Sequence, residues 1–173
     1  MTVQTVEVKI ENLPTHISAP FYGKNVDENG NALPSKREKS WTFTLSNSRL
    51  NTHMTFKSVR PKGHYLTDPT TLYVMDGNDV YEKIGTVGKS GALNASYVVG
   101  SSRLSLAQDT LKWLLSANQE DMESSPHLKI FAQSRCARCA RKLTNPNSIE
   151  FFFGPICRGK ANISKPAQPK AKK

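Results

Sequence analysis

Three cysteines are the residues of this chain whose type and spacing best suit chemistry. Cys136 and Cys139 form a C-x-x-C pair, and Cys157 follows after a gap of 17 residues. A C-x-x-C pair turns the backbone so that two thiolates can converge on one metal ion. Gly154-Pro155 predicts a second tight turn directly before Cys157, which would deliver a third thiolate to the same ion. The pattern therefore predicts a zinc site on these three cysteines.

Two other uses of the cysteines stay open. They could pack as small apolar side chains, or they could form a redox pair. The redox use lacks the βαβ pattern that normally surrounds such a motif. A disulfide framework is disfavoured because the number of cysteines, three, is odd. Zinc remains the favoured interpretation because neighbouring basic residues stabilise the thiolate form that binds metal.

Basic residues surround the cysteines and indicate a partner of opposite charge. The net charge of the chain is +10, and it is unevenly distributed. Residues 1–125 hold 13 Lys and Arg against 13 Asp and Glu, whereas residues 126–173 hold 11 against one, Glu150. A neutral body with a strongly basic end is typical of a protein that binds a polyanion. A basic end that only keeps the protein soluble is the alternative.

Six basic side chains next to the cysteines are the predicted contacts to nucleic acid. A zinc site would hold them in a fixed array, and they would contact phosphates. Such contacts give affinity and salt sensitivity but no sequence specificity. The six residues are Arg135, Arg138, Arg141, Lys142, Arg158 and Lys160.

Upstream of the cysteines, alternating apolar residues predict a small antiparallel sheet. Turn residues at Asn47-Ser48 and at Asp76–Asp79 predict two hairpins. Residues 19–40 are rich in Pro, Gly, Asn and Lys and predict a mobile loop. The expected strands lie at residues 6–10, 41–45, 54–57, 71–75, 80–87, 97–99 and 128–131.

One helix is expected, from about Ser105 to Asn118. Ser105 is a suitable N-cap, and Gln108 stands three residues later, as in a capping box. Leucines at positions 111, 114 and 115 follow helical spacing. Residues 119–126 read as a polar linker. The sequence therefore predicts an α+β fold of residues 1–125, a zinc knuckle of residues 126–160, and a disordered lysine-rich tail of residues 161–173.

The segment that contains the cysteines resembles a known family. Residues 135–149, closed by Gly154-Pro155-Ile156-Cys157, resemble short zinc-finger-like domains found mainly in tailed-phage and actinobacterial proteins. The usual pattern there is C-x-x-C-G-R-x-L-T-x-P-x-S-I, followed by G-[IL]-G-P-x-C. A weaker resemblance to phage proteins covers residues 40–118. The resemblance implies a phage-encoded chain with a metal site, and it implies no particular activity.

The chain departs from that pattern at three places. Ala140 replaces a glycine, and Phe152-Phe153 replace small residues before Gly154. Many family members have a histidine four residues before the first cysteine, where this chain has Ala132. Structural zinc takes four ligands, and His127 is the nearest histidine, nine residues ahead of Cys136. The fourth position could therefore hold His127 or water, or the site could hold no metal.

We expect a non-catalytic, zinc-binding protein that binds DNA or RNA through its basic end. The chain lacks glycine-rich phosphate loops and the common hydrolase motifs, so we expect no enzyme and no small-molecule substrate. The rival hypothesis is a phage effector that binds a host protein, with zinc purely structural. Its support is the long polar segment of residues 18–40. No signal peptide or apolar membrane span is evident, so we expect a cytoplasmic protein, in the host cytoplasm if phage-encoded.

Overall fold

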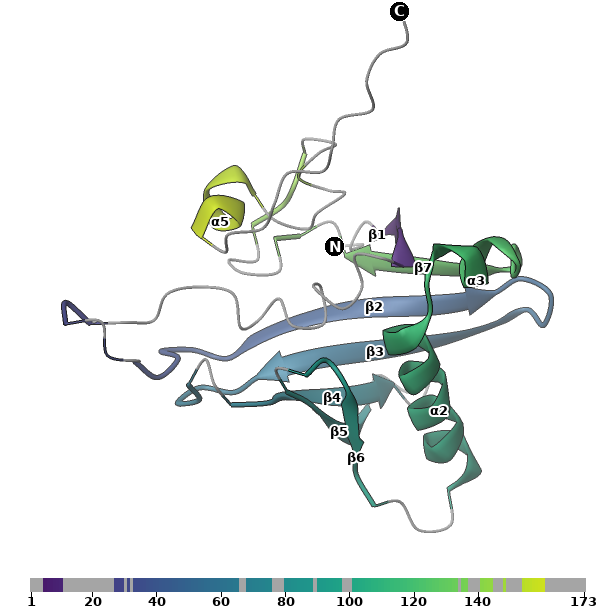
Figure 1. Cartoon of the computed structure of the whole chain (residues 1–173), viewed down its shortest axis with the longest axis horizontal. Helices are drawn as coiled ribbons and strands as arrows, with labels where there is room; N and C mark the ends of the chain where they lie inside the picture. The colour runs from purple at the N-terminus through teal and green to yellow at the C-terminus, as the bar shows by residue number, and fades with distance from the viewer. Residues whose placement is uncertain are drawn as a thin grey trace, which may run out of the picture.

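The strands predicted from alternating residues pair into one antiparallel sheet (Figure 1). The computed structural model describes residues 5–10, 27–29, 31, 33–65, 68–75, 80–88, 90–97, 101–133, 135–136, 141–144, 148 and 154–160. Within these residues the sheet has seven strands in the order β1-β7-β2-β3-β4-β5-β6. The strands are β1 (Thr5–Val8), β2 (Lys39–Asn47), β3 (Thr52–Arg60), β4 (Thr70–Met75), β5 (Tyr81–Val87), β6 (Leu93–Ala95) and β7 (Leu128–Gln133).

Helices connect β6, at one edge of the sheet, to β7, which lies next to the other edge. Strands β2 to β6 follow one another as a meander, and α2 (Ser102–Ser116) and α3 (Gln119–Glu123) then lead back across the sheet to β7. A third helix, α5 (Pro155–Lys160), follows the cysteine segment. The predicted α+β class is confirmed. Among the described residues, no helix is long and apolar enough to cross a membrane.

The first predicted hairpin is confirmed and has a well-defined turn. Strands β2 and β3 pair along their full lengths, from Lys39 opposite Arg60 to Asn47 opposite Thr52. The Asn47 side-chain oxygen accepts hydrogen bonds of 3.1 Å from the backbone amides of Arg49 and Leu50. Asn51 closes the turn with φ of 50°, a left-handed conformation that asparagine tolerates better than most residues.

The alternating residues of β2 form the centre of the core. Trp41, Phe43 and Leu45 point to the buried face, and the Phe43 ring stacks on Trp41 at 5.4 Å and on Phe56 of β3 at 5.2 Å. Helix α2 covers this face with Leu111 and Leu114, which are fully buried. The opposite face carries threonines and lysines, so the period of two in the sequence separates core from solvent.

A bulge in β5 is held in place by a side chain of α2. The register between β4 and β5 shifts after Leu72, which pairs with Gly85. The buried amide of Gln108 donates hydrogen bonds to the carbonyl oxygens of Ile84 (2.8 Å) and Ser96 (2.7 Å). Gln108 is therefore a bridge between helix and sheet, and not the capping-box residue that the sequence predicted.

Replacing Gly85 with alanine is expected to destabilise the sheet. A Cβ at this position would lie 2.5 Å from the Asn94 carbonyl oxygen and 2.8 Å from Leu93 Cδ1. Backbone must move to accept it, at a cost of about 1–3 kcal/mol. Gly88→Ala is the matched control, because a Cβ there meets nothing within 4 Å. Urea denaturation of the two variants measures the difference, and equal midpoints would contradict this packing.

The helical region and one strand differ from the prediction. Helix α2 begins at Ser102 with Ser101 as its N-cap, which accepts a hydrogen bond of 3.2 Å from Leu104. The predicted linker at 119–126 contains α3, where Asn118 and Asp121 form a capping box. The strand expected at residues 97–99 lies instead at β6, and Tyr97 is exposed. Residues 98 and 99 lie outside the described residues.

The sheet takes strands from both sides of the boundary predicted at residue 125. Strand β7 pairs with β1 on one side and with β2 on the other. Its Ile130 and Ala132 are buried, and the core also includes Cys136 and Leu143. The cysteine segment is thus directly continuous with the sheet. The predicted tail of residues 161–173 and part of the predicted loop at 19–40 lie outside the described residues.

Candidate metal centre

Two of the three predicted cysteine ligands line one cavity. Cys136 and Cys157 are 21 positions apart in sequence, and both border an open cavity of about 250 Å³. Thr144 and Ser148 add hydroxyl groups to its lining, and Gly154 and Pro155 complete the wall beside Cys157. The fold therefore brings cysteine side chains from two separate segments to one cavity, and soft sulfur is a ligand type that zinc takes.

Cys136 is positioned by the end of β7 and by a tight reversal of the chain. Arg135 forms an antiparallel bridge with Lys142. The Cys136 amide donates a hydrogen bond of 2.8 Å to the Arg141 carbonyl. This bond joins the residues on either side of positions 137–140, a stretch that includes Cys139. Cys139 itself lies outside the described residues, as does Arg138.

Cys157 is positioned by the short helix α5. Pro155 is its first residue, a favoured place for proline because the first amide of a helix has no partner within the helix. The Arg158 amide donates a hydrogen bond of 2.9 Å to the Gly154 carbonyl and closes the first turn. Gly154-Pro155 thus opens a helix and not the tight turn that the sequence predicted, but it still brings Cys157 to the cavity.

The cavity is anchored to the core of the sheet. Cys136 is 2% exposed, Leu143 is 6% exposed, and Cys157 packs against the same apolar cluster. Ile156 stands at the opening and is largely exposed. Packing on one side therefore fixes the Cys136 side chain, while the opposite side of the cavity opens to solvent.

The donors present fit a zinc ion in type. Two cysteines share the cavity, and Cys139, the third predicted ligand, lies outside the described residues. Within the described part of the chain, no third histidine, cysteine or carboxylate joins Cys136 and Cys157. When bound, zinc would join Cys136 and Cys139 to α5 through the thiolates of the three cysteines.

His127 is not brought to the cysteines. Its carbonyl accepts hydrogen bonds from the amide and the hydroxyl of Ser48, at 2.9 and 3.2 Å. These bonds place His127 beside the β2–β3 turn. The six residues of β7 separate it from Cys136, a distance of about 20 Å along the strand. His53 is exposed in β3, His64 lies beyond the end of β3, and His16 lies outside the described residues.

Four of the six predicted phosphate contacts have described side chains. Arg135, Arg141 and Lys142 are exposed, and Arg158 is half-buried on α5. Arg141 and Lys142 border the cavity together with the cysteines. Lys160 ends α5, and its side chain lies outside the described residues. The structure therefore concentrates positive charge around the candidate metal centre, at a surface open to solvent.

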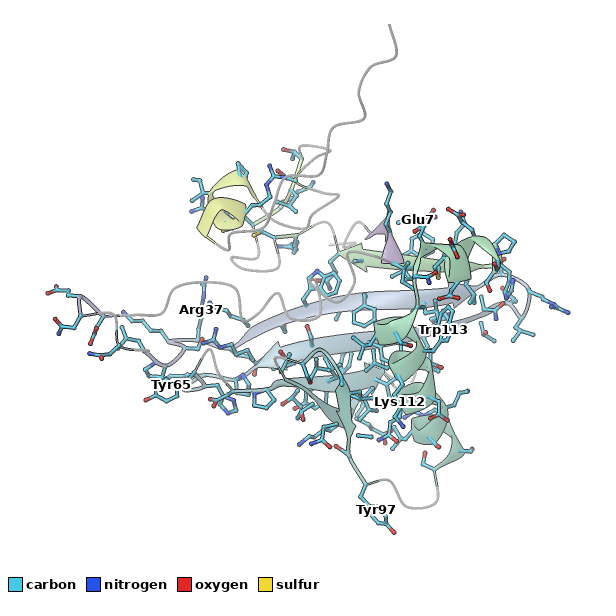
Figure 2. All side chains as sticks on the ribbon, in the orientation of Figure 1. Glu7, Arg37, Tyr65, Tyr97, Lys112 and Trp113 are labelled. Atoms are coloured by element: carbon cyan, nitrogen blue, oxygen red, sulfur yellow. The ribbon has the colours of Figure 1, made fainter. Side chains whose placement is uncertain are left out.

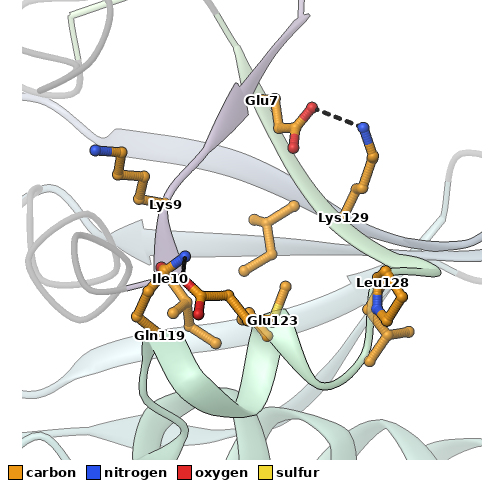
Figure 3. Close-up of a pocket in the computed structure, with 10 residues that line it drawn as sticks. Glu7, Lys9, Ile10, Gln119, Glu123, Leu128 and Lys129 are labelled. Atoms are coloured by element: carbon orange, nitrogen blue, oxygen red, sulfur yellow. Dashed lines mark hydrogen bonds and ion pairs between the residues drawn. The ribbon is translucent and has the colours of Figure 1, made fainter.

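A second cavity, which the sequence did not indicate, lies between β1, α3 and β7 (Figure 3). It measures about 410 Å³ and has an apolar floor that includes Met122 and Ile130. Its rim carries Lys9, Glu123 and the ion pair of Glu7 with Lys129, at 3.2 Å. Both signs of charge alternate around it, so this cavity favours no single class of ligand. This cavity could not be predicted, because residues 119–126 read as a polar linker.

Comparison with known proteins finds one similarity. Residues 132–162 match a family of unknown function (DUF6011). No curated protein and no solved structure gives a significant match. The matched residues begin in β7 and include Cys136, Cys139 and Cys157. The segment that is similar to this family is therefore the segment that holds the candidate metal centre.

Proposed function

We propose that this chain binds one zinc ion through Cys136, Cys139 and Cys157 and binds nucleic acid, without catalysis, through the basic surface around that ion. The observation that carries the proposal is the shared cavity of Cys136 and Cys157, which Arg141 and Lys142 also border. Thiols and exposed cations thus lie at one surface. The metal has a structural role, and the cations make the contacts.

Zinc stabilises the basic surface by joining two segments that are separate in sequence. Cys136 follows β7, and Cys157 lies in α5, which has six residues. Metal binding in so small a unit contributes directly to folding. Each exposed cation is then held at a fixed position, so less conformational entropy is lost when it meets a phosphate.

Binding is expected to be independent of base sequence. Exposed Arg and Lys side chains contact phosphates, and neutralised phosphates release condensed counterions. The logarithm of affinity therefore falls linearly with the logarithm of salt concentration, by about 0.7–0.9 per contact. A chain of this kind covers nucleic acid or attaches to it, and does not select a site.

Replacing Arg138, Arg141 and Lys142 together with alanine is expected to weaken binding to all oligonucleotides alike. The slope of log affinity against log salt concentration should become shallower by the equivalent of about two to three phosphate contacts. The control replaces Arg49, Lys83 and Lys112 with alanine. These substitutions remove the same amount of positive charge from exposed positions outside the cysteine segment. Fluorescence anisotropy of a labelled oligonucleotide over a series of salt concentrations measures both slopes.

Absence of binding by the unmodified chain at low salt would contradict the proposal. Equal slopes for the two triple variants would contradict the assigned surface. The basic end would then serve solubility or contact an acidic protein, and a host-protein effector would become the better proposal. Pull-down from host lysate with and without nuclease separates these two classes, because only a nucleic-acid bridge is lost on digestion.

A further inference from the structure

A second set of basic side chains lies at one end of the sheet. Residues 33–39 and 60–68 hold five Lys and Arg against two acids, Glu38 and Asp68, and one of the five, Arg60, is buried. Lys36, Arg37 and Lys62 are exposed. Figure 2 shows Arg37 and Tyr65 at this end, far from Lys112 and Trp113 on α2. We call Lys36, Arg37, Lys62 and Tyr65 the basic sheet end.

The basic sheet end is built on a fixed backbone. The Ser35 amide donates to the His64 carbonyl, and the Gly63 amide donates to the Ser35 carbonyl, each at 2.8 Å. Arg60 lies underneath, 1% exposed, and its Nη2 donates to the His64 carbonyl at 3.2 Å. Burial lowers the pKa of Arg60, and the charge of Asp68 opposes that shift. These bonds hold residues 35–37 against residues 62–65.

Tyr65 presents its ring to solvent from a held backbone. The side chain is 43% exposed. Its amide donates to the Asp68 carboxylate at 2.7 Å, and the Asp68 amide donates to the Tyr65 carbonyl at 3.2 Å. An exposed aromatic ring among cations is the combination by which proteins hold single-stranded nucleic acid.

Strand register places this set at the same end of the sheet as the metal centre. Phe43 of β2 lies opposite Ala132 of antiparallel β7. Lys39 is four residues before Phe43, and Cys136 is four residues after Ala132, so both lie in the same direction from this pair. The start of β2, the end of β3 and the cysteine segment therefore leave the sheet at one end, as Figure 1 shows.

Charge of the other sign gathers at the far end. Helix α3 carries Glu120, Asp121 and Glu123, and Glu123 lines the second cavity. This helix lies near the β2–β3 turn, beside the start of β7 (Figure 1). The separation of charge is partial, because Glu38 and Asp68 also lie at the basic sheet end, and Arg49 and Lys129 lie near α3. A polyanion is attracted mainly by the exposed cations of the cysteine segment, Arg135, Arg141 and Lys142, which lie at the same end as the basic sheet end.

We propose that single-stranded nucleic acid bound at the cysteine segment continues across the basic sheet end. Lys36, Arg37 and Lys62 contact its phosphates, and Tyr65 stacks on a base. The inference rests on the proposed function and extends it to a partner class and to a second contact surface. Stacking needs an unpaired base, so it selects single strands over duplex, while the phosphate contacts serve both.

Two sets of variants test the proposal in the full chain. Lys36→Ala, Arg37→Ala and Lys62→Ala together should reduce the salt slope for a single-stranded oligonucleotide by about two contacts. The Arg49, Lys83 and Lys112 triple is the control of equal charge. Tyr65→Ala should lower single-strand affinity about tenfold and leave affinity for a duplex of equal length unchanged, whereas Tyr65→Phe should bind as the unmodified chain does.

The outcomes separate this inference from the proposed function. If the unmodified chain binds no oligonucleotide, both fail together. If it binds, and the Arg138, Arg141 and Lys142 triple weakens binding while the basic-sheet-end triple matches its control, this inference alone is overturned. Equal single-strand affinities of Tyr65→Ala and Tyr65→Phe overturn it as well. Thermal melting of each variant shows whether a loss of affinity reflects a loss of folding.

Discussion

A chain truncated after Ser125 is expected to lose its cooperative unfolding transition. The sheet makes this the expected outcome, although the sequence predicts that residues 1–125 fold by themselves, because their strands and helix hold most of the large apolar residues. Removing β7 separates β1 from β2 and leaves Phe43–Asn47 of β2 without the strand that pairs with it. It also removes Ile130, which is 1% exposed, from the centre of the core.

The expected loss is large relative to the stability of a small domain. Deleting a buried isoleucine side chain costs about 2–5 kcal/mol, and β7 contributes a whole strand of hydrogen bonds as well. Domains of this size are stable by about 5–15 kcal/mol in total. The control chain ends after Lys160 and retains every described element. Circular dichroism during heating compares the two, and a cooperative transition in the shorter chain would contradict the sheet order.

The strands themselves could be predicted because their residues alternate, but their order could not. Alternation at Trp41, Phe43 and Leu45 reports a half-buried strand from local sequence alone. The place of β7 between β1 and β2 depends on contacts between residues far apart in sequence. Helix α3 was not predicted because Met122 is the one apolar side chain among its five residues. Helix α2 was predicted to begin too late because Ser101 and Ser105 are both good N-caps.

Removing the metal is expected to unfold the cysteine segment while most of the sheet survives. Cys139→Ser should release the zinc, and backbone amides of residues 135–160 should then exchange hydrogen faster. Metal binding supplies much of the folding free energy of small zinc modules, so the expected loss exceeds that of any single packing change in this segment. Hydrogen exchange with elemental analysis on the same sample measures both effects.

Leu143→Ala separates loss of metal from general loss of stability. Leu143 is buried beside the cavity and has no metal-binding group. Its truncation should lower stability by about 2–5 kcal/mol and leave the zinc content at one ion per chain. If the cysteines are only packed side chains, Cys139→Ser, like Leu143→Ala, will lower stability without changing the zinc content. The unmodified purified chain will then contain no zinc.

The candidate site was predictable only where its signal is local. The C-x-x-C spacing indicated Cys136 and Cys139, and Gly154-Pro155 pointed to Cys157. The strand expected at residues 128–131 already indicated a separation of His127 from Cys136, and the structure extends that strand to residue 133. The contact of His127 with Ser48 could not be predicted, because it depends on the pairing of β7 with β2. The basic sheet end was hidden for a related reason. A charge count over residues 1–125 adds Arg37 to Glu120 and cannot show that they lie at opposite ends.

The most direct test is the affinity of the full chain for a labelled single-stranded oligonucleotide before and after zinc is removed with a chelator. We predict salt-dependent binding by the zinc-loaded chain and an affinity at least tenfold weaker after chelation, restored when zinc is returned. Affinity that is unchanged by chelation would contradict the claim that metal holds the binding surface. Absence of binding by the zinc-loaded chain at low salt would contradict the claim that nucleic acid is the partner.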